Sequence, residues 1–400
     1  MSRKLLASGV AAIALCFVLP TLALADSATI IQQNETNGYA SQDQPGAYPA
    51  GPSGPAGSWG NVAYISQSGG DGDVATQEQN RSQFALPYPD NAAGGNQSIT
   101  QTNNAAAQAS QTDNSYASVQ TINQTGNTGS VSTTATQTIN APNGGISPPD
   151  WNPAGQTQTA TQTSNQGSSI SQVIGVSNDP LAVTYNNQQT ATQTSQVRSS
   201  IAQSLDGETA NGNAQTAEQT NGGNNAITQQ VLLSGVNNTQ NASIDNGNAN
   251  TIGQSQNGGS GNTQTASVSG GDSNVLNQTQ NASSTGVQTA SVSNGYFNSV
   301  TQAQGGSNNA QTASISNANS NTVNQYQGIG GANIQTATVS YSNGGLIVQQ
   351  QNGSSSNGQQ TAYQLNNPGA NQITQIQNTS GNVATVTQSN SSGNVATQKQ

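Results

Sequence analysis

The stretch that decides the fold is residues 298–315, which read NSVTQAQGGSNNAQTASI. Asn, Val and two Gln residues stand at every second position, a Gly-Gly-Ser segment follows, and Asn, Gln, Ala and Ile then alternate in the same way. A spacing of two is the side-chain period of a β-strand and not of a helix. Gly, Asn and Ser tolerate the positive φ angles of tight turns. The stretch therefore predicts strand, turn, strand, with the marked residues inside and the alternate Thr, Ser and Ala residues facing water.

The same unit recurs along the chain at a nearly constant spacing. A Gln-Thr-Ala triplet or a close variant supplies one series, which places Ala217, Ala242, Ala266, Ala290, Ala313, Ala337 and Ala362 in step. Halfway between, a second motif sets an apolar residue two positions before a Gln, at Ile227/Gln229, Ile252/Gln254, Leu276/Gln278, Val300/Gln302, Val323/Gln325, Ile347/Gln349 and Ile373/Gln375. A fixed period of this length indicates a repeat architecture. We therefore predict an all-β chain, an amyloid-like β-solenoid of stacked strand-turn-strand coils of about 24 residues each.

Stacked coils bring like residues above one another at the strand spacing of roughly 4.7–4.9 Å. A Gln amide in such a column donates to the coil on one side and accepts from the coil on the other. One coil alone cannot do this, so stability must come from contacts between neighbouring coils. The residues predicted to form this structural ladder are Gln254, Gln278, Gln302, Gln325, Gln349, Gln375, Gln264, Gln288, Gln311, Gln335, Ala266, Ala290, Ala313, Ala337, Ile252, Leu276, Val300, Val323, Ile347 and Ile373.

The spacing within each unit resembles the curlin repeat of curli fibres. The best matches are Asn371-x-Ile373-x-Gln375-x-Gln377 with Asn382-x-Ala384-x-Val386-x-Gln388, the half-unit Asn394-x-Ala396-x-Gln398-x-Gln400, and Asn61-x-Ala63-x-Ile65-x-Gln67 with Asp73-x-Ala75-x-Gln77. The resemblance implies a secreted subunit that leaves a Gram-negative cell unfolded through an outer-membrane secretion pore and polymerises, with a nucleator subunit, into biofilm matrix. This chain departs from the simplest curlins in its length, in its Pro-rich interruptions, and in Gln264, Gln311 and Gln335, where Ala is usual. These departures are compatible with a major subunit, a nucleator or a distant curlin-like protein.

The N-terminal segment over 1–25 has the features of a signal peptide. Arg3 and Lys4 precede an apolar run over residues 5–19, and the small-residue site Ala23-Leu24-Ala25 follows. The run is too short for a membrane span. We predict cleavage near Ala25, secretion, and no membrane span after cleavage. The rest divides into irregular repeats with Gly/Pro-rich loop insertions over 26–155 and a regular curlin-like solenoid over 156–400.

The insertions are concentrated in the first of these parts, at Pro45–Pro55, Leu86–Asp90 and Pro142–Pro153. Because proline cannot donate to a strand ladder, these segments are expected to be loops between coils. They and their flanks carry the aromatic residues Tyr48, Trp59, Tyr88 and Trp151. The loops are either plain insertions, sites for carbohydrate or partner contacts, or proline gatekeepers that slow aggregation.

The composition excludes several functions. After Ala25 there are 3 basic and 15 acidic side chains, a net charge of −12, with no His or Cys. Nucleic acid is not an expected partner, because phosphate binding needs clustered Lys and Arg. No nucleophile–base pair or thiol/imidazole metal set can be assembled, so we expect neither enzyme activity nor a cofactor. The segment Gly69-Gly70-Asp71-Gly72-Asp73 is similar to a calcium-binding nonapeptide, but it occurs once and Val74 replaces the expected Asp, which favours a turn.

Three kinds of function remain: a subunit of an extracellular fibre, a monomeric surface adhesin or ice- or ligand-binding solenoid, and a disordered matrix polypeptide. The ice-binding alternative rests on an outward column of Thr265, Thr289, Thr312, Thr336 and Thr361. Its neighbouring positions are mixed, and include Val287, Ala310 and Ile334, so β-propensity explains the column as well. The repeat continues through residues 394–400 without a capping pattern, which favours the fibre subunit.

Overall fold

The computed structural model describes residues 27–43, 62–79, 96–113, 118–128, 131–140, 155–175, 186–206, 211–233, 235–352 and 356–400. The segment interpreted as a signal peptide, the three Pro-rich interruptions, and the aromatic residues Tyr48, Trp59, Tyr88 and Trp151 lie outside these residues. Within them the regular elements are 28 β-strands, with no helix. The all-β prediction is confirmed.

The strands form two parallel sheets of 14 strands each, one from the odd-numbered and one from the even-numbered strands. The odd sheet contains β1 (Ser27–Gln33), β3 (Val62–Ser68), β5 (Asn96–Thr102), β7 (Val119–Thr125), β9 (Thr157–Thr163), β11 (Gln188–Val197), β13 (Ala214–Gly223), β15 (Thr239–Asn248), β17 (Thr263–Ser269), β19 (Val287–Ser293), β21 (Ala310–Ser316), β23 (Ile334–Ser340), β25 (Gln359–Leu365) and β27 (Val383–Ser389). The even sheet contains β2 (Tyr39–Asp43), β4 (Val74–Gln79), β6 (Ala107–Asp113), β8 (Thr133–Asn140), β10 (Ser169–Gly175), β12 (Ser200–Asp206), β14 (Ala226–Leu232), β16 (Thr251–Asn257), β18 (Val275–Ser284), β20 (Ser299–Ser307), β22 (Thr322–Gln327), β24 (Leu346–Gln351), β26 (Gln372–Gln377) and β28 (Val395–Lys399).

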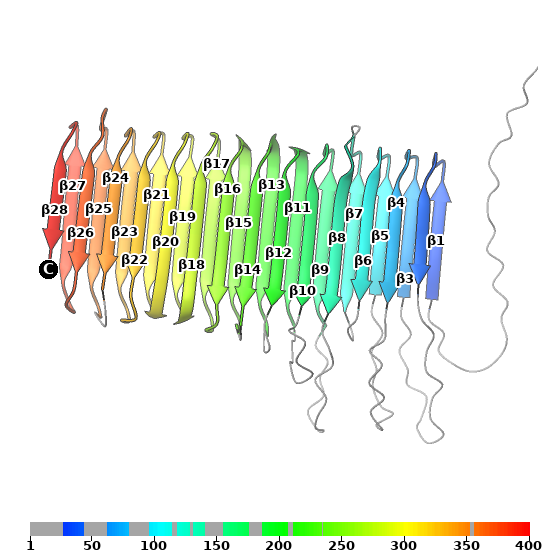
Figure 1. The fold of residues 1–400 in the computed structure, drawn as a ribbon, viewed down its shortest axis with the longest axis horizontal. Helices are drawn as coiled ribbons and strands as arrows, with labels where there is room; N and C mark the ends of the chain where they lie inside the picture. The colour runs from blue at the N-terminus through cyan, green and yellow to red at the C-terminus, as the bar shows by residue number, and fades with distance from the viewer. Residues whose placement is uncertain are drawn as a thin grey trace, which may run out of the picture.

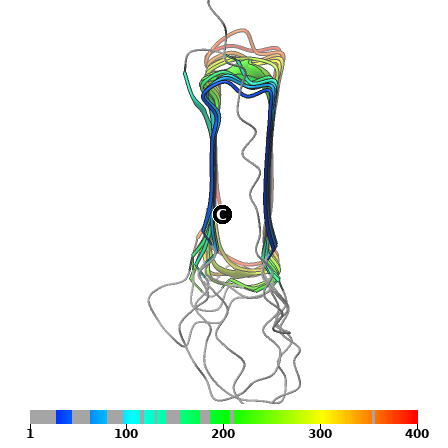
Figure 2. The same ribbon diagram turned by 90° about the vertical axis from the view of Figure 1, so that its right-hand side faces the viewer.

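The arrangement is a β-solenoid in which each coil gives one strand to each sheet. In Figure 1 the coils follow one another along the long axis, from β1 at one end to β28 at the other. In the view turned by 90°, the two sheets are straight, facing walls joined by short turns (Figure 2). The predicted stack of strand-turn-strand coils is therefore confirmed.

Neighbouring coils pair in a register that superposes like residues. Between β13 and β27 the register of the odd sheet repeats at the coil length expected from the sequence, so that Gln264, Gln288 and Gln311 are successive partners. Most earlier coils are longer: 35 residues separate Ser27 from its partner Val62, and 38 separate Gln120 from Gln158, although only 23 separate Gln97 from Gln120. Both sheets nevertheless run unbroken through the irregular and the regular part of the chain, because the extra residues lie between the paired strands.

The turns depend on residues that accept a positive φ. The residue that follows the seventh position of each odd strand has this conformation, with φ of 54° at Asn246, 66° at Gly270 and 51° at Asn294. Asn and Gly populate the left-handed region at low cost. Gly271 is the tightest case, because its φ is 98° and an added Cβ would collide with the carbonyl oxygen of Gly295 in the next coil. The Gly and Asn residues of the repeat thus let successive turns stack closely.

The core is a thin strip between the sheets, in which large and small side chains compensate one another. In the early coils the odd sheet supplies Ile, such as Ile65 and Ile99, while the even sheet supplies Ala, such as Ala75. From the fifth coil the roles are exchanged, with Ala160 in the odd sheet and Ile170 in the even sheet. Because one sheet gives the large residue where the other gives Ala, the distance between the sheets stays compatible with dense packing.

Candidate functional site

The feature that runs through the whole molecule is a column of Gln residues in the even sheet. We call it the even Gln column; it consists of Gln42, Gln77, Gln111, Gln137, Gln172, Gln203, Gln229, Gln254, Gln278, Gln302, Gln325, Gln349, Gln375 and Gln398. Each Nε2 donates to the Oε1 of the next coil toward the C-terminus, at 2.7–2.9 Å as far as Gln375 and at 3.4 Å for the last bond. One residue of every coil is thus linked to the next in a single direction.

The same amides also connect the two sheets. The Nε2 of Gln302 donates to Gln325 at 2.7 Å and to the backbone carbonyl of Thr289 in the odd sheet at 3.0 Å. Equivalent bonds recur along the column, for example from Gln254 to the carbonyl of Asn241 at 2.9 Å. Each buried amide therefore satisfies both of its N–H groups and its oxygen without water, which a buried polar group needs.

The odd sheet holds a second series of amides, the odd Gln column. It includes the four predicted residues Gln264, Gln288, Gln311 and Gln335 within a run from Gln97 to Gln360. Its amide bonds measure 2.7–2.9 Å and point the same way along the axis. Unlike the even Gln column it is bounded, because Ala63 and Ala384 occupy the positions before and after it.

The apolar residues predicted for the ladder lie beside these columns in one buried cluster. It brings together Ala266, Ala290, Ala313 and Ala337 from the odd sheet with Ile252, Leu276, Val300, Val323, Ile347 and Ile373 from the even sheet. All ten are at most 1% exposed. Burying such aliphatic side chains contributes about 1.5–3 kcal/mol each.

Sequence reasoning placed the Asn residues that precede the strands inside the coil but assigned them no hydrogen-bonding role. In the even sheet, the Oδ1 of Asn250 accepts from the backbone N–H of Asn274 at 2.9 Å, and its Nδ2 donates to the carbonyl of Gly271 at 2.9 Å. Asn274 repeats both bonds with the following coil. These Asn side chains form hydrogen bonds with backbone N–H and C=O groups at the turns, which the strand ladders leave without a partner. Their recurrence at the repeat spacing was the signal that could have revealed this role.

Asp73 occupies the same position before β4, and its environment differs. Its Oδ1 accepts from the N–H of Ala107 at 3.0 Å, whereas its buried Oδ2 has no hydrogen-bond partner. Burial raises the pKa of Asp73 to about 6; the charges of Glu35 and Asp71 act in the same direction, and the N–H of Ala107 opposes them. Burial also raises the pKa of Glu35, whose Oε2 likewise has no partner. The Gly69–Asp73 segment is a turn, with φ of 68° at Gly69 and 72° at Gly72.

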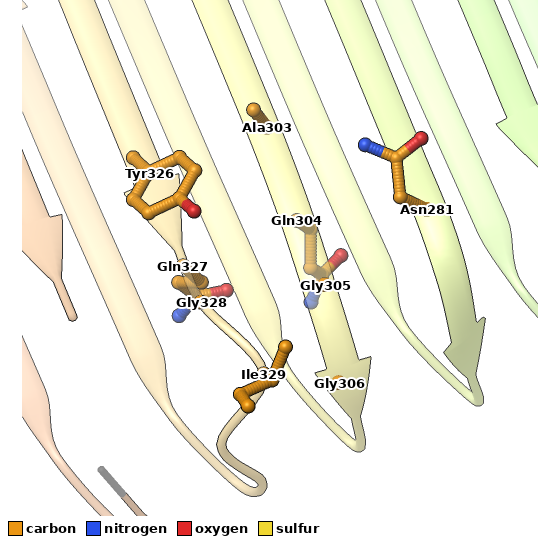
Figure 3. A pocket seen from close by; sticks show the side chains of 9 residues that line it. All are labelled: Asn281, Ala303, Gln304, Gly305, Gly306, Tyr326, Gln327, Gly328 and Ile329. Carbon is orange, nitrogen blue, oxygen red and sulfur yellow. The ribbon is translucent and has the colours of Figure 1, made fainter. Parts of the chain in front are cut away.

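The outer faces carry mostly Thr, Ser and Asn, with a few exposed apolar residues. A hollow of about 450 Å³ lies on the even sheet between Asn281 and the turn after β22. Figure 3 shows Tyr326 and Ile329 beside Gly305 and Gly306 in it. Tyr326 is 49% and Ile329 78% exposed, and Tyr326 is the one titratable side chain in its lining. The hollow offers an apolar surface and no acid–base pair.

The two ends present open strand edges. Within the described residues, no strand lies beyond β1 and β2 or beyond β27 and β28. Their outer N–H and C=O groups therefore have no ladder partner there, and such edges are templates for pairing with another chain. Ile30 points inward in line with Ile65, yet it is 45% exposed because no described coil covers it.

The described residues contain no group of three or more His, Cys, Asp or Glu side chains that could hold a metal ion. Among the same residues, no helix is long and apolar enough to cross a membrane. The sequence matches no family model, and no curated protein matches it either.

Proposed function

We propose that this chain is a secreted structural subunit that assembles end to end into an extracellular, curli-like amyloid fibre for biofilm matrix, adhesion and cell aggregation. One observation carries the proposal. The even Gln column links every coil from Gln42 to Gln398 in one direction, and among the described residues no strand pairs with the outer edges at either of its ends. A second copy placed on either end would continue the backbone ladder and the column together.

The physical argument is that a coil is stabilised by its neighbours and not by its own core. Ordering about 24 residues costs on the order of 1–2 kcal/mol per residue, which the one or two aliphatic side chains of a coil cannot offset. The inter-coil hydrogen bonds supply the rest, and within the part of the chain that the structure describes the end coils have them on one side only. Adding a copy gives both end coils their missing neighbour, so growth of the stack is favoured.

Export and partners belong to the same proposal and rest on sequence. The apolar run over residues 5–19 with Ala23-Leu24-Ala25 supports secretion. The curlin resemblance supports an outer-membrane secretion pore and a nucleator subunit as partners. Nucleic acid is not among the proposed partners, since the mature chain has three scattered basic residues. We propose no enzyme activity and no cofactor.

The test is assembly of the chain from residue 26 onward, diluted from denaturant to about ten micromolar. We expect a lag, then fibres that bind thioflavin and diffract with the strand spacing of roughly 4.7–4.8 Å along the fibre axis. Preformed fragments should abolish the lag because their ends are templates. A monomer that keeps β-type circular dichroism for days without fibres would instead support the monomeric adhesin, and a chain that stays disordered would support the matrix polypeptide.

A further inference from the structure

The last coil repeats the interior of the first coils and not that of its own neighbour. We compare five inward positions, three from the odd and two from the even strand of a coil. They are Ala384, Val386, Gln388, Ala396 and Gln398 in the last coil, Ala28, Ile30, Gln32, Ala40 and Gln42 in the first, and Gln360, Ala362, Gln364, Ile373 and Gln375 in the coil before the last. The last coil thus matches the first at every position, allowing Val for Ile, but matches its neighbour at the two Gln positions alone.

This match restores the packing pattern of the early coils. In those coils the odd sheet supplies the large residue and the even sheet supplies Ala, whereas in the middle of the molecule the odd sheet supplies Ala and the even sheet the large residue. The last coil has the early arrangement again, with Val386 in the odd sheet and Ala396 in the even sheet. A copy stacked on the C-terminal end would set Val386 against Ile30 and Ala396 against Ala40. Ile30 would then be covered, as Ile65 is inside the molecule at 0% exposure.

The amide columns are polar and fix the direction of stacking. Gln32 and Gln42 donate inward to Gln67 and Gln77, so their oxygens face the N-terminal end. At the other end, Gln398 accepts from Gln375, so its amide N–H groups are the ones that face outward. A C-terminal end therefore presents donors where an N-terminal end presents acceptors. Two like ends would oppose donor to donor or acceptor to acceptor.

The charged side chains on the outer surface also differ between the two ends of the stack. One outward column of the even sheet runs through Asp43, Glu78, Thr112, Thr138, Val173, Ser204, Gln230, Ser255, Thr279, Ala303, Tyr326, Gln350, Ile376 and Lys399. Within this column the carboxylates stand at the N-terminal end and the ammonium stands at the C-terminal end. Lys399 is also the one Lys after Ala25 in the sequence.

We infer that two copies of this chain join head to tail in one register, with β27 and β28 of one copy pairing in parallel with β1 and β2 of the next. In this register Gln388 meets Gln32, Gln398 meets Gln42, and Lys399 lies beside Asp43 with Glu78 one coil further on. The inference rests on the proposed fibre function and adds to it the interface, its direction and its residue pairs.

Charge exchange between the two ends tests this register. The variants are Asp43→Lys, Lys399→Glu and the double variant, with Asp206→Lys as a matched control, because Asp206 is exposed on the same sheet in the middle of the stack. Elongation from each variant's own fibre fragments is measured at low salt. Like charges directly opposite on neighbouring strands are unfavourable, so each single end variant should elongate about fivefold more slowly. The double variant should recover to within about twofold of the parent, since the pair is re-formed with reversed sign.

Mixing the two single end variants tests the register in a second way. Equal amounts of Asp43→Lys and Lys399→Glu should elongate faster together than either does alone, because the carboxylate introduced at the C-terminal end of one variant meets the ammonium introduced at the N-terminal end of the other. The differences should shrink in roughly 1 M salt, where the screening length falls to about 3 Å. Because the substitutions are at exposed positions, circular dichroism should be unchanged for all four variants.

The outcomes separate the two proposals. Fibres that form from the parent, with equal elongation rates for all variants or with no recovery in the double variant, overturn the register and leave the fibre function standing. A slow Asp206→Lys control also overturns it, because the effect would then follow net charge and not the ends. Failure of the parent to form any fibre overturns both the function and the interface.

Discussion

The amide of a single Gln shows why this interior requires repetition. Gln302 has 0% exposure; its oxygen accepts from Gln278, and its two N–H groups donate to Gln325 and to the carbonyl of Thr289. An isolated Gln at such a site would leave polar atoms without partners, at a cost of about 1–3 kcal/mol for each. The polar core is therefore stable only when the same residue recurs in the coils above and below.

Replacing Gln302 and Gln325 together by Leu should destabilise the fold and slow assembly. The change removes the acceptor of Gln278 and the donor to Gln349, and each buried group left unsatisfied costs about 1–3 kcal/mol. The free energy of unfolding and the rate of seeded assembly would be measured at equal concentration.

The matched control changes Thr301 and Asn324 to Ser, because these residues lie between the ladder positions on the outer face. It should change either quantity little. If both double variants slow assembly equally, or neither does, the inward and outward assignment of these residues is wrong.

Asp73 shows the opposite case, in which one residue does not fit its column. Where Asn250 donates through Nδ2 to a carbonyl, Asp73 places a buried oxygen that can donate only when protonated. The folded state therefore holds this proton to higher pH than the unfolded chain does, with a pKa raised from 3.8 to about 6. The free energy of unfolding should consequently fall as the pH rises from about 4 to about 6 and then level off for this group.

Asp73→Asn should remove this part of the pH dependence and stabilise the first coils at neutral pH. Asn supplies the N–H donor of the column and carries no charge at any pH, so the variant and the parent should differ least below about pH 4. Hydrogen exchange of the amides in β3 and β4, in acid and at neutral pH, would measure it. Asp206→Asn is the exposed control, and an unchanged pH dependence in Asp73→Asn would contradict the assignment.

At the scale of the element, the coil and not the strand is the unit of the fold. Thr251 and Val275 occupy the same register position in successive even strands, as do Thr263 and Val287 in the odd sheet. The chain between them returns to the same sheet with the same face inward. Removing a segment of one full coil therefore keeps the register, because each following residue then stacks on the equivalent residue of the preceding coil.

Deleting residues 251–274 should leave a folded solenoid that is shorter by one coil. Asn250 then leads into Val275, Leu276 stacks on Ile227, and Gln278 stacks on Gln229, so both sheets keep their columns. We expect the same circular dichroism per residue and a modest loss in the free energy of unfolding, measured by denaturant titration.

Deleting only residues 251–262 is the matched control. It moves β17 into the even sheet, where Gln264 stacks on Ile227 and Ala266 on Gln229, and the even Gln column is broken. This variant should lose at least several kcal/mol or fail to fold, because buried amides lose their partners. Equal stability of the two deletions would show that register is not what holds the coils.

At the scale of the whole molecule, the stack tolerates coils of unequal length. The register passes from Gln120 to Gln158 across 38 residues with the same 2.9 Å amide bond that the shorter coils make. Loop closure becomes only slowly more costly with length, so insertions between strands change stability little.

Removing Pro142–Pro153 should therefore leave folding and assembly intact. The deleted segment belongs to neither β8 nor β9, and without it the coil approaches the length of the regular ones. Circular dichroism and seeded fibre growth of the deletion and the parent should agree. Complete loss of assembly would show that this segment is part of the core or of a contact between copies.

The sequence by itself determined the strand-turn-strand coil, its length, and the inward Gln, Ala and aliphatic residues of the regular part. It could do so because a fixed period converts position in the chain directly into position in the stack, so that Gln278, Gln302 and Gln325 must share a column once one coil is understood.

The tertiary structure decided the rest. The pairings between the first strands follow no period, because the length of an insertion does not enter the register. The exchange of Ile and Ala between sheets and the buried, unpaired oxygen of Asp73 depend on what the opposite sheet and the next coil supply, and those neighbours are distant in the chain. For the same reason the match between the first and last coils, which lie at opposite ends of the molecule, emerged only when every coil had been placed in register.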